Sequence, residues 1–213
     1  EDVAWFVDGF RVRYRIVVNR GVKDAAEVLA TLEPAQIVAL QKQFDKDNRK
    51  FASEFELDAG NEKRRRVRLK RMLTQIEDWT GDLNREQEAK IAALLVPIPL
   101  MEHLRHEDRM RRQREFVELL NLRRAGPEFA TRLQQWLMEW DHGRAPEYAL
   151  LSEEVYHQRL KFYTAVDQLI TREQRHRALG RLKKYADDCR TLSARPAAHA
   201  GNDGVAGTLR AFF

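Results

Sequence analysis

Apolar side chains that recur every three to four residues constrain this chain more than any other feature of its sequence. In residues 34–57, for example, Ile37, Phe44 and Phe51 fall on one stripe of a helix. This spacing gives an α-helix one apolar face and one polar face. Only 10 Gly and 6 Pro interrupt the 213 residues. The pattern therefore predicts an all-α protein whose helices each bury one stripe.

The same spacing, with Gly and Pro as helix ends, predicts about eight helices packed as antiparallel hairpins. We expect these helices at residues 3–30, 34–57, 62–80, 85–96, 100–124, 128–141, 147–169 and 172–192. Composition changes after Arg195, where Ala, Gly and Asn become frequent and no period remains. We therefore expect one helical domain over residues 1–195, followed by a flexible or docked tail at 196–213.

The stripes also predict which side chains are buried. In residues 172–192 the inward stripe contains Leu179, Leu182, Tyr185 and Cys189. We interpret Cys189, the single cysteine, as a small buried hydrophobe. The tryptophans have helical spacing, which favours a core role, and a ligand groove is the alternative. They are Trp5, Trp79, Trp136 and Trp140.

Charge excludes some classes of protein. Charged residues make up 33% of the chain, but 38 Lys and Arg against 33 Asp and Glu leave a net charge of only +5. This balance permits an acidic partner without requiring one. Acidic residues are abundant and no nucleic-acid motif is present, so we expect no nucleic-acid binding. No apolar run reaches the roughly 18 residues of a membrane-spanning helix, so we expect no transmembrane segment.

The densest charged cluster is a basic run in the predicted helix at residues 62–80. Its members are Lys63, Arg64, Arg65, Arg66, Arg68, Lys70 and Arg71. Helical geometry spreads them around more than one side, so some should reach solvent together. These residues could bind phosphates, acidic lipid headgroups or an acidic protein. The alternative is a solvated helix face with internal ion pairs.

Catalytic and metal-binding motifs are scarce. His103 and Glu107 could place two metal ligands on one helix face, but two ligands do not make a site. Neither a cysteine pair nor a His-Glu-x-x-His motif accompanies them, so we expect no metal site and no cofactor. No nucleophile elbow, Gly-rich phosphate loop or paired-carboxylate signature is present. We therefore expect a non-enzymatic protein.

Three predicted helix starts share one pattern. They read Leu32-Glu-Pro-Ala-Gln36, Leu83-Asn-Arg-Glu-Gln87 and Ile170-Thr-Arg-Glu-Gln174. The side chain of Asn84 or Thr171 can accept an unpaired backbone N–H, and the glutamine can reach back to the cap. Glu33 is a poorer cap, although Pro34 suits the first helical position. We interpret these starts as capping boxes, each worth about 1 kcal/mol.

The aliphatic-Thr-x-x-Gln start also resembles the signature of Spy/CpxP-type periplasmic helical proteins. A longer pattern, from Leu32 to Leu192, resembles an uncharacterised family of Gram-negative bacterial lipoproteins, a domain of unknown function. Its elements here are the Leu32 start, Asn48-x-x-Phe51-x-x-x-Phe55, the basic run 63–71, Gly81, Leu83 and Gln87, the arginine-rich helix around Arg109–Phe116, the Tyr148 helix, and the start Thr171–Gln174.

That resemblance implies an exported protein. Members have a lipid-modified cysteine near the N-terminus and a further helical segment before the point where this chain begins. Cys189 lies near the other end and cannot replace that cysteine. The resemblance therefore implies a periplasmic protein, lipid-anchored to the outer membrane through a segment absent from this chain.

Together these features predict an envelope-associated binding or scaffold protein of undetermined oligomeric state. We expect protein or acidic membrane-surface partners, with the residues Lys63, Arg64, Arg65, Arg66, Arg68 and Arg71 as candidate contacts. A Spy/CpxP-like chaperone for unfolded clients is one alternative. A metal-responsive envelope-stress protein that uses His103 and Glu107 is another.

Overall fold

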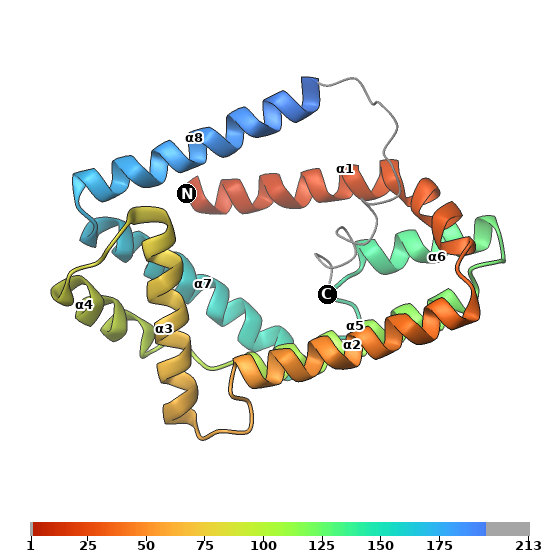
Figure 1. Ribbon diagram of the computed structural model, residues 1–213, viewed down its shortest axis with the longest axis horizontal. Helices are drawn as coiled ribbons and strands as arrows, with labels where there is room; N and C mark the ends of the chain where they lie inside the picture. Colours follow the sequence, from red (N-terminus) through yellow and green to blue (C-terminus); the bar gives the residue numbers. More distant parts are fainter. Residues whose placement is uncertain (1, 195–213) are drawn as a thin grey trace. The chain divides into compact units, whose positions relative to one another are not determined.

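The computed structural model describes residues 2–194, which form eight α-helices and no strand (Figure 1). The helices are α1 (Asp2–Ala30), α2 (Pro34–Glu54), α3 (Asn61–Thr80), α4 (Arg85–Leu95), α5 (Glu102–Leu120), α6 (Pro127–Met138), α7 (Pro146–Leu169) and α8 (Arg172–Ala194). The predicted all-α class is confirmed, and each predicted helix ends within a few residues of its expected limits. The predicted tail, residues 196–213, lies outside the described residues.

Local sequence explains where the helices begin and end. Pro34, Pro127 and Pro146 are the first residues of α2, α6 and α7, because a proline ring suits the first helical turn. Gly81 ends α3 with a φ of 82°, and its N–H donates to the Glu77 carbonyl. Glycine is suited to this left-handed conformation because it has no Cβ atom.

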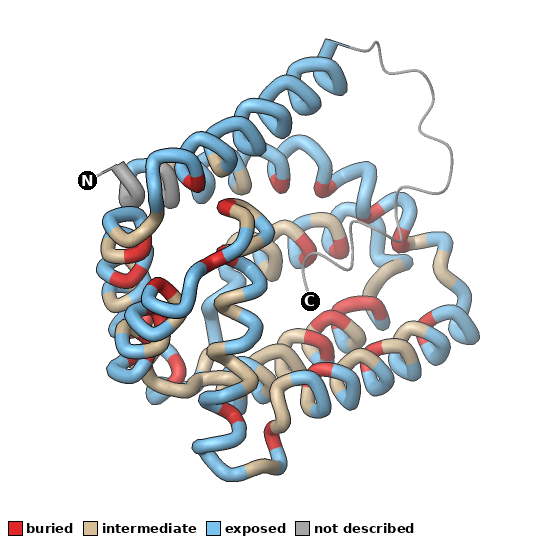
Figure 2. The backbone as a smooth tube through the Cα atoms, turned by 60° about the vertical axis from the view of Figure 1, so that its left-hand side comes forward, coloured by how far each residue is buried: buried red, intermediate tan, exposed pale blue. Residues whose placement is uncertain are grey.

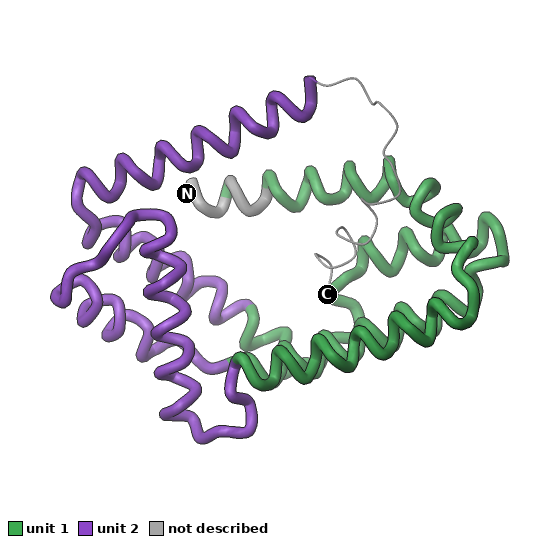
Figure 3. Tube along the Cα trace, viewed as in Figure 1, with its two compact units in different colours: residues 1–54, 101–152 green, residues 55–100, 153–213 purple. Residues whose placement is uncertain are grey.

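Contacts group the helices into two compact units (Figure 3). Unit 1 comprises the described parts of residues 1–54 and 101–152, and unit 2 those of residues 55–100 and 153–213. In unit 1, α1 packs on α6, and α2 packs on α5. In unit 2, α3 packs on α8 and α4. Except for α3 with α4, these pairings join helices that are far apart in the sequence.

Each unit has its own apolar core, and Figure 2 marks the buried residues in red. In unit 1, Phe116 and Leu120 of α5 and Phe129 of α6 are almost completely buried. In unit 2, Ile91 of α4 and Phe162 of α7 are similarly buried. Each such side chain contributes about 1.5–3 kcal/mol of hydrophobic free energy.

The expected burial of the α8 stripe is wrong. Leu179 and Leu182 are 57% and 52% exposed, Tyr185 is 48% exposed, and Cys189 is exposed as well. Figure 2 shows α8 as almost entirely exposed. Helical spacing identifies an apolar face, but it does not say whether another helix covers that face.

The core interpretation is also wrong for two tryptophans. Trp5 is 76% exposed and Trp140 is 48% exposed. Trp136, by contrast, is half-buried and stacks on Phe116, with 5.1 Å between ring centroids. Trp79 is half-buried too and lies 5.9 Å from the Tyr185 ring.

Candidate functional site

The basic run of α3 does not form one continuous cationic surface. Arg64 is buried at 7% exposure, and Arg68 is half-buried. Most of its exposed members have local partners: Lys63 with Glu56 at 3.0 Å, Arg66 with Glu62, Arg65 with the Val96 carbonyl at 3.1 Å, and Arg71 with the Phe55 ring at 4.3 Å. The fold therefore directs these residues to several separate contacts.

Arg68 closes the corner that follows α4. Its guanidinium donates to the carbonyls of Leu95 at 2.8 Å, Ile98 at 2.7 Å and Pro99 at 3.1 Å. Carbonyls at the C-terminal end of a helix lack helical partners, and Pro97 stops the helix from continuing. Arg68 therefore supplies the donors that this corner needs.

Replacing Arg68 with alanine should lower the free energy of unfolding by about 2–3 kcal/mol, because three carbonyls lose their donor. The free energy of unfolding of Arg68→Lys should lie between those of the unmodified protein and Arg68→Ala, since an ammonium group cannot reproduce the planar guanidinium fork. Urea unfolding followed by circular dichroism measures both. The control is Arg66→Ala, which removes an exposed ion pair worth less than about 1 kcal/mol. Equal losses for Arg66→Ala and Arg68→Ala would contradict this role.

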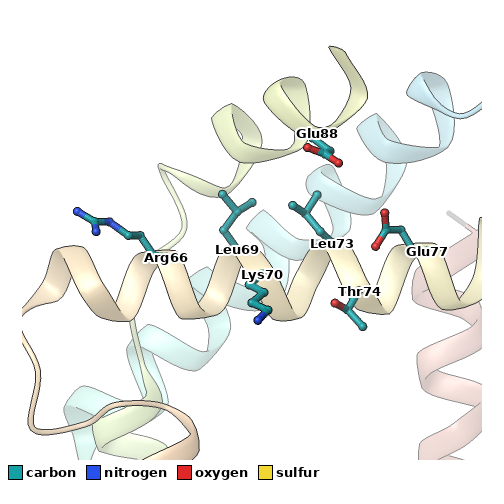
Figure 4. Close-up of a pocket in the computed structure, with 7 residues that line it drawn as sticks. All are labelled: Arg66, Leu69, Lys70, Leu73, Thr74, Glu77 and Glu88. Atoms are coloured by element: carbon teal, nitrogen blue, oxygen red, sulfur yellow. The ribbon is translucent and has the colours of Figure 1, made fainter. Parts of the chain in front are cut away.

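An open groove of about 290 Å³ lies along α3 in unit 2 (Figure 4). We call it the α3 groove, and its lining residues are Arg66, Leu69, Lys70, Leu73, Thr74 and Glu77 of α3 with Glu88 of α4. Leu69 and Leu73 stand in the middle of the row, between Arg66 at one end and Glu77 at the other (Figure 4). This arrangement suits an apolar group flanked by charges of both signs.

The two candidate metal ligands, His103 and Glu107, are both exposed on the surface of α5. Among residues 2–194, no group of three His, Cys, Asp or Glu side chains could hold a metal ion. His106 lies between them in sequence but is half-buried, with its ring stacked 5.5 Å from that of Phe51.

A carboxylate shared by two arginines was not identified from the sequence. Asp108 accepts hydrogen bonds from Arg111 at 2.7 Å and 3.0 Å, and Arg144 Nε lies 3.7 Å from its other oxygen. The three side chains are only 11–18% exposed. Arg111 also donates to the His142 carbonyl at 2.8 Å, so the α6–α7 loop is attached to α5.

Electrostatics keep Arg111 charged within this cluster. Burial lowers the pKa of Arg111, but hydrogen bonds and charges from Asp108 and Glu115 raise that pKa by more. Its neighbour Arg112 lies 3.7 Å above the Trp136 ring, and burial lowers the pKa of Arg112. The arginine-rich part of α5 therefore serves internal contacts of unit 1.

The predicted capping boxes are confirmed at two helix starts. Asn84 Oδ1 accepts the Gln87 N–H at 2.9 Å, and Thr171 Oγ1 accepts the Gln174 N–H at 3.2 Å. Each glutamine Oε1 accepts the N–H of its own cap residue, at 3.0 Å and 2.9 Å respectively. At the third start, the Gln36 side chain accepts the Glu33 N–H at 2.8 Å.

The two complete boxes also bind each other inside unit 2. Gln87 Nε2 donates to Gln174 Oε1 at 2.8 Å and to the Leu169 carbonyl at 3.1 Å. Gln174 Nε2 donates back to Gln87 Oε1 at 3.3 Å and to the Asp82 carbonyl at 2.8 Å. Each glutamine thus reaches the carbonyl five residues before the other, a reciprocal arrangement that spacing alone did not reveal.

A second surface of interest is the exposed apolar side of α8. We call the residues Leu179, Leu182, Cys189 and Leu192 the α8 face. The helix carries seven Arg and Lys against three Asp and Glu. Lys183 and Arg190 come directly after Leu182 and Cys189 in the sequence, and both are exposed. An uncovered apolar row on a basic helix is typical of a surface that binds a partner.

Comparison with known proteins gives one match. A family model described as "Family of unknown function (DUF6279)" matches residues 13–149, more than half of the 213 residues. The expected membership of a family of unknown function is confirmed, although the start Thr171–Gln174 lies beyond the matched residues. No curated protein and no solved structure matches the chain. Within residues 2–194, none of the helices has the length and apolar character needed to cross a membrane.

Proposed function

Because the chain belongs to the family of unknown function DUF6279, we propose a role for it from its own surfaces. We propose that it is a non-catalytic, envelope-associated binding or scaffold protein. The α8 face carries this proposal. Leu179, Leu182 and Leu192 are each more than half exposed. Exposed apolar side chains along a basic helix support contact with a protein or a membrane surface.

The envelope location rests on the resemblance to exported Gram-negative lipoproteins. We propose a periplasmic protein, held at the outer membrane by a lipid on a segment upstream of this chain. A basic amphipathic helix suits that setting, because anionic headgroups attract its Lys and Arg while its apolar face enters the acyl boundary.

The protein is expected to co-sediment with vesicles that contain anionic phosphatidylglycerol, and less as salt is added. Leu182→Ser should weaken vesicle binding about tenfold, because a polar group replaces part of the apolar contact area. Leu150→Ser is the matched control, since Leu150 is 73% exposed but lies on α7. Equal binding of the two variants, or no binding of the unmodified protein at low salt, would rule out this contact.

The exposed α8 face also favours a second candidate, a Spy/CpxP-like chaperone that holds unfolded clients. Light scattering from an unfolding client separates the two functions. Suppression of aggregation at near-stoichiometric ratios, reduced in Leu182→Ser, would favour the chaperone. The metal-responsive alternative is tested by zinc calorimetry, in which unchanged heats for His103→Ala would remove it.

A further inference from the structure

The α3 groove has a symmetry that the proposed function does not use. Its six α3 residues form three pairs about the midpoint between residues 71 and 72: Arg66 with Glu77, Leu69 with Thr74, and Lys70 with Leu73. If α3 is turned end for end about this midpoint, the same six positions line the groove. In an antiparallel copy of this helix, each residue would therefore lie opposite the other member of its pair.

The charges at the two ends of the groove are opposite in sign. Arg66 and Lys70 make the N-terminal half of the groove basic, whereas Glu77 and Glu88 make the other half acidic. Reversal brings Arg66 of one copy opposite Glu77 of the other, twice across a twofold axis. Within the described chain, Lys70 and Glu88 have no ion pair, and reversal brings Lys70 toward the acidic half.

We propose that the α3 groove is a self-association surface occupied by α3 of a second copy, antiparallel and related by a twofold axis. Such an interface is isologous, because the same patch is used on both copies. At the centre each copy contributes Leu69 and Leu73 beside Lys70 and Thr74, and two Arg66–Glu77 pairs close the ends.

The contacts that Arg66 and Glu77 make within their own chain are weak, so they do not prevent these residues from pairing with a second copy. Arg66 pairs with Glu62 in an exposed i,i+4 ion pair, in which the two side chains are 74% and 82% exposed. Such pairs contribute little free energy, so Arg66 can change partner. Glu77 Oε1 accepts the Leu83 N–H only at 3.4 Å, close to the limit for a hydrogen bond.

The interface is small. The stretch from Arg66 to Glu77 covers about 16 Å of helix, so it buries less than the roughly 1,200–2,000 Å² of a stable interface. We expect a weak dimer with a dissociation constant of about 10–100 μM. Added salt should weaken it further, because two ion pairs lie at its ends.

Sedimentation equilibrium of the whole chain over a wide concentration range tests the proposal. Arg66→Glu and Glu77→Arg each place like charges opposite one another, so each should weaken the dimer at least tenfold. The double variant, with both changes in one chain, should dimerise again. A mixture of the two single variants should form heterodimers, because both facing pairs then have opposite charges.

The control is Arg132→Glu, an exposed arginine of α6 that pairs with Glu128, which should leave the dimer unchanged. Dichroism checks that each variant folds, and Arg66→Ala, expected to weaken the dimer less than Arg66→Glu, serves if a reversal does not fold. A protein that stays monomeric throughout, or a dimer unaffected by both reversals, would overturn the proposal.

Failure here and failure of the proposed function can be told apart. Leu182→Ser lies on the α8 face and should leave the dimer intact while it weakens vesicle binding. If Leu182→Ser abolishes self-association and Arg66→Glu does not, the α8 face forms the dimer and the α3 groove is not the interface.

Discussion

Gln87→Ala is expected to lower the free energy of unfolding by about 3 kcal/mol, because several buried polar groups lose their partners together. Gln87 is only 6% exposed and Gln174 9%. The substitution removes the acceptor of the Asn84 N–H, the donor to the Leu169 carbonyl, and both hydrogen bonds to Gln174. Urea unfolding followed by circular dichroism measures the loss.

Gln36→Ala provides the matched control for this prediction. Gln36 occupies the same position in the third helix start, but it is exposed and its side chain accepts only the Glu33 N–H. Loss of such a cap contact costs about 1 kcal/mol or less. A loss for Gln87→Ala no larger than for Gln36→Ala would show that the reciprocal pair adds no stability.

A double-mutant cycle isolates the contact between the two glutamines. Gln87→Ala and Gln174→Ala should be less damaging together than the sum of the single losses, by about 1–2 kcal/mol, since the second substitution removes a group already left unpaired. Strict additivity would mean that the two amides do not stabilise each other.

Asp108→Ala should cost about 2–4 kcal/mol, because two largely buried arginines lose their shared carboxylate. Asp108 is 13% exposed, and Arg111 and Arg144 are 18% and 11% exposed. The loss should also release the loop that holds His142, since Arg111 is positioned by Asp108 and donates to that carbonyl. Thermal unfolding measures the first effect, and limited proteolysis between α6 and α7 measures the second.

An exposed carboxylate serves as the comparison. Glu128→Ala removes an ion pair with Arg132 in which both side chains are more than half exposed, and this should cost less than about 1 kcal/mol. Asp108→Asn, which keeps an acceptor oxygen but loses the charge, should fall between the two. If Asp108→Ala leaves both the melting temperature and the loop cleavage unchanged, the shared carboxylate does not fasten the loop.

Local features of the fold could be predicted from the sequence. Helix positions followed from apolar spacing, and helix ends followed from Pro34, Gly81 and Pro127, because these depend on residues within one or two turns. The capping boxes at Asn84 and Thr171 followed for the same reason. No contact with a distant helix is needed for such features to form.

The candidate surfaces were harder to predict, because they depend on which helices meet. The basic run of α3 is one cluster in the sequence, but tertiary contacts turn Arg68 toward the end of α4 and bury Arg64. The α3 groove needs Glu88 from α4 as well as residues of α3. Arg111, the partner of Asp108 on the same helix, follows it at helical spacing, whereas Arg144 does not.

The all-α class, the helix limits and the local caps follow from residues that lie close together along the chain. Packing between helices is needed to bring Gln87 to Gln174, to join Arg144 to Asp108 of α5, and to leave the α8 face uncovered. Backbone hydrogen bonds and caps act within a few residues. Burial and side-chain pairing depend instead on which distant helix packs against a given face.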